Sequence, residues 1–80
     1  MRKLVHGDLR EPNILVCTSA DGRKYARILD FDWAGYDGQV TYPNDLNKFV
    51  KWHEDVRPYR PIKLVHDTHM IEMLTVRNLL

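Results

Sequence analysis

The dipeptide Asp21-Gly22 separates two runs of residues that favour β-structure, and this arrangement constrains the fold more than any other feature of the sequence. The runs 13–18 (NILVCT) and 24–30 (KYARILD) are rich in apolar and β-branched side chains. Asp-Gly is a strong hairpin signal because glycine tolerates a positive φ angle. We therefore predict a β-hairpin that pairs residues 13–18 with residues 24–30.

The stretch that follows the hairpin is predicted to be mostly irregular. Residues 32–40 contain two glycines and are typical of a loop. Residues 45–52 (DLNKFVKW) fit either a short helix that starts near Asn44 or a mostly extended segment. Pro58 and Pro61 exclude a helix over residues 57–61, because proline lacks an N–H donor and restricts the residue before it.

A helix is predicted from Asp67 towards the C-terminus. Asp67 or Thr68 can cap its start, and apolar residues recur near the helical period from Met70 to Leu80. The expected fold class is therefore α+β, with a hairpin, a long loop and a C-terminal helix in one small domain, residues 1–80.

The composition of the chain argues against two classes of binding partner, nucleic acids and membranes. The net charge is +1 among 80 residues, so the chain offers no electrostatic basis for binding nucleic acid or an anionic membrane. No apolar stretch approaches the ~20 residues of a membrane helix. Cys17 is the single cysteine, which excludes an internal disulfide and favours a reducing compartment. A cytoplasmic location is the default expectation, with the nucleus as the alternative; the oligomeric state stays open.

Polar side chains flank both ends of the expected hairpin. His6, Asp8 and Asn13 precede the first strand, and Asp30 ends the second. The start of one strand neighbours the end of the next in a hairpin, so Asn13 and Asp30 should lie at the same end. An amide oxygen and a carboxylate suit a hard cation such as Mg²⁺. With Asp8 facing a substrate hydroxyl, this is a layout for phosphoryl transfer.

The segment His6-Gly7-Asp8-Leu9-Arg10-Glu11-Pro12-Asn13 matches the pattern H-x-D-L-x-x-x-N, and Asp30-Phe31-Asp32 stands where D-F-G would stand. On these residues the chain resembles the protein-kinase-like phosphotransferases. HGDLR and LDFDWAG resemble the aminoglycoside and choline phosphotransferase branch and the divergent kinase-like proteins of fungi. The later YPNDLN, VKW and HDTHMIEML also resemble that fungal group.

The resemblance implies a role for each residue that matches the pattern. Asp8 would be the catalytic carboxylate that accepts or orients the proton of the acceptor hydroxyl. Asn13 and Asp30 would be Mg²⁺ ligands and bind the ATP phosphates through the ion. Arg10 would neutralise charge on the transferred phosphoryl group. The acceptor would be a protein or a small-molecule hydroxyl.

The resemblance also implies structural roles and one departure. His6 would pack near the metal-loop aspartate, and Asp67 would be the buried aspartate of a later helix that braces the catalytic-loop backbone. Gly7 replaces the arginine that usually pairs with an activation-loop phosphate, so control by phosphorylation of such a loop is not expected. Asp32 is either a further acid beside the ion or a solvated loop residue.

Residues 1–80 contain neither G-x-G-x-x-G nor a strand similar to V-A-I-K. The resemblance therefore implies a partial C-lobe, a fragment without the N-lobe that holds ATP. Because positioning supplies most of phosphoryl-transfer catalysis, we expect negligible turnover from the isolated chain. Two alternatives stay open: a non-catalytic remnant that acts as a binding module, and an unrelated small metal-binding domain.

Two other groups of residues suggest ligands at first sight. His53, His66 and His69 could indicate zinc, but His66-x-x-His69 lacks further ligands at a suitable spacing. Trp33, Trp52 and Tyr59 could stack on a ligand, although packing in a core is the simpler expectation.

Overall fold

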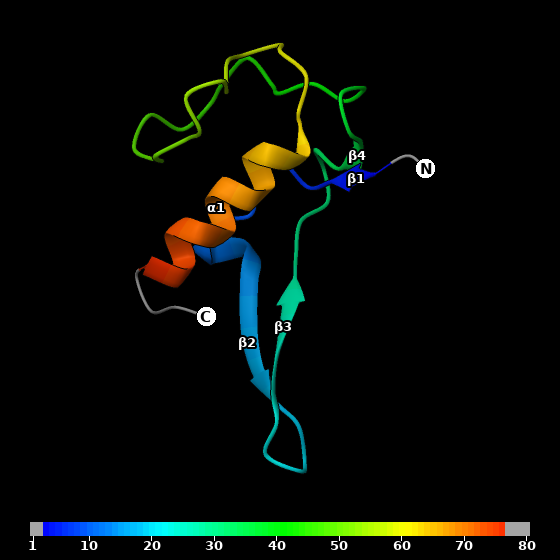
Figure 1. Ribbon diagram of the computed structural model, residues 1–80, viewed down its shortest axis with the longest axis vertical. Helices are drawn as coiled ribbons and strands as arrows, with labels where there is room; N and C mark the ends of the chain where they lie inside the picture. Colours follow the sequence, from blue (N-terminus) through cyan, green and yellow to red (C-terminus); the bar gives the residue numbers. More distant parts are fainter. Residues whose placement is uncertain (1–2, 77–80) are drawn as a thin grey trace.

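The computed structural model describes residues 3–76 and has a mixed α+β fold (Figure 1). Its elements, in chain order, are β1 (Leu4–Val5), the 3₁₀ turn η1 (Glu11–Asn13), β2 (Ile14–Thr18), β3 (Lys24–Ile28), β4 (Gly35–Tyr36) and α1 (Leu64–Val76). The strands form two antiparallel sheets of two strands each, β1 with β4 and β2 with β3.

The hairpin predicted from the sequence is confirmed as β2 and β3. Ile14 pairs with Ile28 and Thr18 pairs with Lys24. Gly22 in the turn has a φ angle of 85°, which explains the need for glycine there. The backbone N–H of Leu29 still donates to the Asn13 carbonyl at 2.8 Å. The second strand ends at Ile28, two residues earlier than predicted.

The second sheet was not predicted, because residues 32–40 were expected to be a loop. Val5 pairs with Gly35, and Leu4 pairs with Tyr36. A Cβ atom at Gly35 would overlap the side chain of Val40, so a larger residue at position 35 would displace this partly buried side chain. This pairing returns the chain after β3 to its N-terminal strand and fixes the loop that lies between β1 and η1.

Helix α1 begins at Leu64, so the predicted start at Asp67 is wrong by three residues. Its first N–H groups need acceptors, and Asp37 supplies one by accepting from the Leu64 N–H at 2.9 Å. Neither expected residue caps the helix: Asp67 lies in its first turn, and the Thr68 hydroxyl donates to the Leu64 carbonyl. The predicted end at Leu80 lies outside the described residues.

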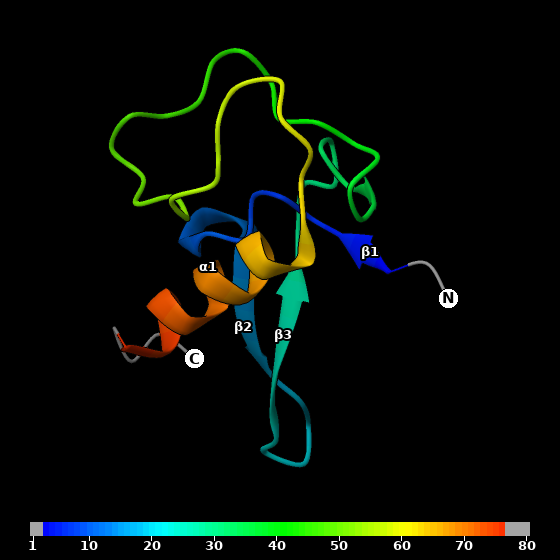
Figure 2. The same ribbon diagram turned by 45° about the horizontal axis from the view of Figure 1, so that its top comes forward.

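The core forms where the long loop 37–63 covers β1 and the start of α1 (Figure 2). Its buried members are Val5, Tyr42, Val56 and Ile62, and the side chains packed against them are Trp33, Val40, Leu46 and Trp52. Residues 45–52 form no helix, so the helical alternative is wrong. Trp33 and Trp52 are core residues, as the simpler expectation held, whereas Tyr59 is 68% exposed.

The β2–β3 hairpin extends away from this core (Figure 1). Every residue of β3 is exposed, including Tyr25 and Ile28. Leu15 and Val16 on β2 are exposed too, although neighbouring residues of a strand point to opposite faces. Both faces of the hairpin therefore present apolar side chains to solvent. Within residues 3–76, no helix is long and apolar enough to cross a membrane.

Candidate functional site

The loop between β1 and η1 has a shape that requires glycine at position 7. Gly7 has a φ angle of 87°, and a Cβ atom there would lie 2.8 Å from Cδ1 of Ile62. Any other side chain would meet both backbone strain and a core residue. The backbone angle and the contact with Ile62 therefore explain why glycine, and not the arginine of the kinase pattern, occupies position 7.

A carboxylate on α1 holds this loop. Asp67 is 6% exposed, and its Oδ2 and Oδ1 atoms accept the backbone N–H groups of His6 at 2.7 Å and Gly7 at 2.9 Å. A carboxylate that accepts two buried N–H groups satisfies donors that would otherwise be costly to bury. The contact expected of Asp67 with the loop backbone is thus present.

Three of the four expected site residues meet within the loop. Oδ1 of Asp8 accepts from Nε of Arg10 at 2.8 Å, and Oδ2 accepts from Nδ2 of Asn13 at 3.0 Å. Nδ2 of Asn13 also donates to the Asp8 carbonyl at 2.9 Å. Asp8 is 7% exposed, so its charge depends on these partners. Asp8 and Asn13 are five positions apart, and the turn η1 brings their side chains together.

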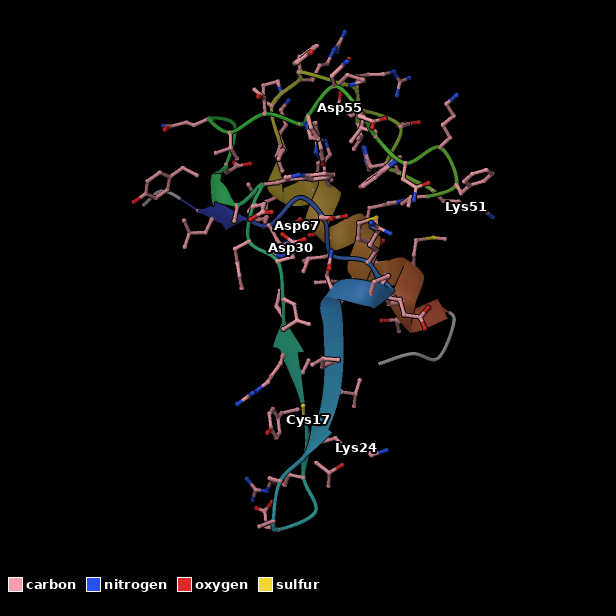
Figure 3. All side chains as sticks on the ribbon, turned by 180° about the vertical axis from the view of Figure 1, so that it is seen from behind. Cys17, Lys24, Asp30, Lys51, Asp55 and Asp67 are labelled. Carbon is pink, nitrogen blue, oxygen red and sulfur yellow. The ribbon has the colours of Figure 1, made fainter. Side chains whose placement is uncertain are left out.

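Asp30 lies at the same end of the hairpin as Asn13, as predicted, and away from Cys17 and Lys24 near the turn (Figure 3). It has a φ angle of 57°, and its Oδ1 accepts the N–H of Asp32 at 3.3 Å. The Leu29–Asn13 backbone bond brings the two segments together. No hydrogen bond within residues 3–76 joins the side chains of Asn13 and Asp30. Both Asp30 and Asp32 are exposed.

His6 connects the loop to the segment around Asp30. Its Nδ1 accepts the N–H of Asp8 at 3.1 Å, so the ring proton lies on Nε2, which donates to the Leu29 carbonyl at 2.9 Å. The ring also meets Phe31 edge-on, with 5.1 Å between ring centroids. His6 therefore contacts the two residues on either side of Asp30 in the chain.

The oxygen atoms fit a cation only in part. Within residues 3–76, no group of three or more His, Cys, Asp or Glu side chains is placed to hold a metal ion. Asn13 Oδ1 and the exposed carboxylate of Asp30 are hard oxygen ligands of the kind Mg²⁺ takes, and Mg²⁺ usually keeps several waters. Within residues 3–76, no hydrogen bond or ion pair brings these two side chains into contact.

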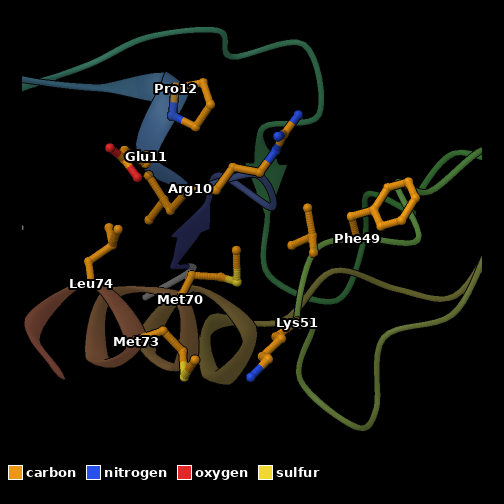
Figure 4. A pocket seen from close by; sticks show the side chains of 10 residues that line it. Arg10, Glu11, Pro12, Phe49, Lys51, Met70, Met73 and Leu74 are labelled. Carbon is orange, nitrogen blue, oxygen red and sulfur yellow. The ribbon is translucent and has the colours of Figure 1, made fainter. Parts of the chain in front are cut away.

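A pocket of about 520 Å³ lies between the loop and α1 (Figure 4). Leu9, Arg10 and Pro12 form one wall, and Met70 and Leu74 on the helix form the other. This pocket could not be predicted from the sequence, because its walls are far apart along the chain. Its lining is largely apolar, with the charges of the loop at one side.

His53, His66 and His69, the three residues considered above for zinc, lie together in space and are called the histidine cluster below. The ring centroids of His53 lie 5.3 Å from His66 and 5.4 Å from His69. In the sequence, the spacing His66-x-x-His69 was the local signal for this cluster. Both nitrogens of His66, Nδ1 of His53 and Nε2 of His69 form hydrogen bonds to protein groups, as described below.

Comparison of this chain with known protein families, with curated proteins and with solved structures finds no match.

Proposed function

We propose that the chain carries the catalytic loop and the metal loop of a protein-kinase-like C-lobe, which in its complete form transfers the γ-phosphoryl group of ATP to a hydroxyl. The observation that carries this proposal is the hydrogen-bonded set Asp8, Arg10 and Asn13, whose loop is held by Asp67. Phosphoryl transfer needs a carboxylate, a cation and a metal-ligating oxygen at fixed positions. The loop fixes all three in one short segment.

In this proposal each side chain acts from its place in the loop. Asp8 accepts or orients the proton of the acceptor hydroxyl through Oδ1, the atom that Arg10 now contacts. Arg10, which is one-third exposed, turns from Asp8 towards the transferred group and balances its charge. Asn13 keeps Asp8 oriented by donating from Nδ2, which leaves Oδ1 for a cation.

Asn13 and Asp30 are the residues that would hold Mg²⁺, and the bound ion would screen the charges of the ATP phosphates. His6 supports this arrangement because it joins Leu29 and Phe31, on either side of Asp30, to the loop. The backbone bond from Leu29 to Asn13 adds a second connection at the same place. Asp30 is therefore attached to the loop although its own side chain faces solvent.

Calorimetric titration of the 80-residue chain with Mg²⁺, in the absence and presence of ATP, tests the proposal. Asp30→Asn should weaken the binding of Mg²⁺, because a carboxylate ligand is replaced by a neutral amide. Asp32→Asn is the matched control: it removes an equally exposed acid two positions away and should leave binding unchanged. Equal effects of the two substitutions, or no heat of Mg²⁺ binding at all, would contradict the proposal.

One observation favours the alternative function as a binding module. The apolar residues of the hairpin are exposed on both faces, with Leu15 48% and Val16 54% accessible. A surface of this kind is typical of a site that another protein covers. A stable chain that shows no response to Mg²⁺ or ATP would support that alternative over the phosphotransferase.

A further inference from the structure

His66 is among the most deeply buried side chains of the described residues, at 1% exposure, and every polar atom of its ring is engaged. The backbone N–H of Lys63 donates to Nδ1 at 3.1 Å. The hydroxyl of Tyr42 lies 2.8 Å from the same nitrogen. Because a backbone N–H can only donate, Nδ1 accepts and carries no proton.

The remaining ring nitrogen of His66 completes a connection to the long loop. The single ring proton lies on Nε2 and is donated to Oδ2 of Asp55 at 3.1 Å. Burial, the largest cause, and nearby carboxylates raise the pKa of Tyr42 well above its usual value, so its hydroxyl keeps its proton and donates it. His66 therefore joins Tyr42 and Asp55 to α1 as a neutral imidazole.

The other two members of the histidine cluster also bind the loop. Nδ1 of His53 accepts the N–H of Asp55 at 3.1 Å, so it carries no proton either. Nε2 of His69 lies 3.2 Å from the Lys51 carbonyl and donates to it. His53 sits between the rings of His66 and His69. The cluster thus attaches loop residues 51–55 to the first two turns of α1.

Charged groups of both signs face this cluster. Asp55 is 41% exposed at its side chain, and the His66 hydrogen bond, the largest cause, lowers the pKa of its carboxyl. Asp55 therefore stays ionised as the pH falls towards 5. The charged groups that act on Asp55 include Lys63 and Arg60 from the segment before α1, and those that act on Tyr42 include Asp67 from α1 and Asp8 from the loop after β1.

We propose that the histidine cluster is a pH-sensitive latch, which holds residues 51–55 against α1 when its rings are neutral and releases them when His66 takes up a second proton. A proton on Nδ1 would place an N–H against the Lys63 N–H, which can only donate, and would require the Tyr42 hydroxyl to turn from donor to acceptor. The hydrogen bond from Nε2 to Asp55 survives protonation, but the Lys63 N–H loses its acceptor.

The neighbouring rings make the release of residues 51–55 depend more steeply on pH. A second positive charge on His53, about 5 Å from His66, adds repulsion that neutral rings do not have. Histidine gains its second proton near pH 6.5 in water. A ring that takes up its proton only in the released chain makes the ratio of latched to released chain fall as the pH falls from 7.5 to 5.0.

Trp52 reports release directly. Its ring lies 6.2 Å from that of Trp33 and 6.1 Å from that of Tyr42. Two indoles at this separation couple in circular dichroism, and the coupling is lost when residues 51–55 move away. The experiment follows this signal in the full 80-residue chain from pH 7.5 to pH 5.0, with the helical signal at 222 nm measured in parallel.

We expect the coupled tryptophan signal to disappear over this range while the helical signal persists. His66→Asn, whose side-chain oxygen can accept in place of Nδ1 without titrating, should keep the tryptophan signal at pH 5.0. Retention of the signal in the natural chain at pH 5.0, its loss together with the helical signal, or an unchanged transition in His66→Asn would overturn the latch.

His53→Gln provides a second route where His66→Asn does not fold. It removes the neighbouring titrating ring and leaves the His66 bonds in place, so release should need a lower pH than in the natural chain. An unchanged midpoint of release in His53→Gln would overturn the part played by the cluster.

Discussion

Asp67 accepts the backbone N–H of His6 at 2.7 Å, although 61 positions separate the two residues in the chain. The bond joins the first turn of α1 to the loop that carries Asp8, and it is buried. The position of the proposed catalytic carboxylate therefore depends on a helix at the other end of the sequence.

Asp67→Ala should destabilise the protein strongly. It leaves the N–H groups of His6 and Gly7 buried without their carboxylate acceptor, and hydrogen bonds to charged groups contribute about 1.5–3 kcal/mol each. We expect the free energy of unfolding to fall by about 3 kcal/mol or more in urea denaturation. Glu72→Ala, an exposed acid on the same helix, is the control and should change it by about 0.5 kcal/mol or less.

Gly7→Ala and Gly22→Ala form a matched pair that separates packing from backbone strain. Both glycines have φ angles near 86°, at 87° and 85°, so both substitutions carry the left-handed penalty of about 1 kcal/mol. Only at Gly7 would the new Cβ press on Ile62, which adds about 1–3 kcal/mol. Chemical denaturation should show the larger loss for Gly7→Ala; equal losses would mean that the loop is not packed as described.

The exposed hairpin should make the chain self-associate. Val16→Lys replaces an apolar side chain that is 54% exposed, and edge charges discourage pairing between molecules. Light scattering should therefore fall at a given protein concentration while the free energy of unfolding changes by about 0.5 kcal/mol or less. Thr18→Lys, which adds the same charge at an exposed polar position of β2, should have the smaller effect on scattering. A larger fall in scattering for Thr18→Lys than for Val16→Lys would mean that self-association uses another surface.

The hairpin could be predicted because its signal is local: the Asp21-Gly22 turn and the two apolar runs specify β2 and β3 without help from the rest of the chain. The β1–β4 sheet could not, since strands of two residues carry no periodic pattern and Gly35 is required by its distance from Val40. The start of α1 was misplaced for the same reason, because Asp37, far along the chain, caps it.

The site also contains contacts that are local in the sequence, which could be predicted, and contacts between distant residues, which could not. Asp8, Arg10 and Asn13 lie within six consecutive residues, so their meeting follows from one turn of backbone. The Asp67 brace was expected only from the family resemblance, and the three histidines were considered together only as a disfavoured zinc site. Asn13 and Asp30 were placed at one end of the hairpin by strand geometry alone, and the backbone register bears this out.

The isolated 80-residue chain should transfer phosphate from labelled ATP no faster than its Asp8→Ala variant. Residues 1–80 contain no glycine-rich loop and no strand similar to V-A-I-K to position the phosphates, and catalysis of this reaction is mostly positioning. Transfer in the presence of Mg²⁺ is measured side by side for the two proteins. A clear excess for the natural chain would show that the loop alone suffices.

The most direct test of the account locates a paramagnetic Mn²⁺ ion on the chain by nuclear magnetic resonance. Bound Mn²⁺ should broaden the side-chain amide signal of Asn13 and the backbone signals around Asp30, and leave Cys17 and Lys24 near the hairpin turn sharp (Figure 3). Asp30→Asn should remove the broadening, and Asp32→Asn should not. Broadening confined to the histidine cluster, or spread evenly over the chain, would contradict a shared cation site at Asn13 and Asp30.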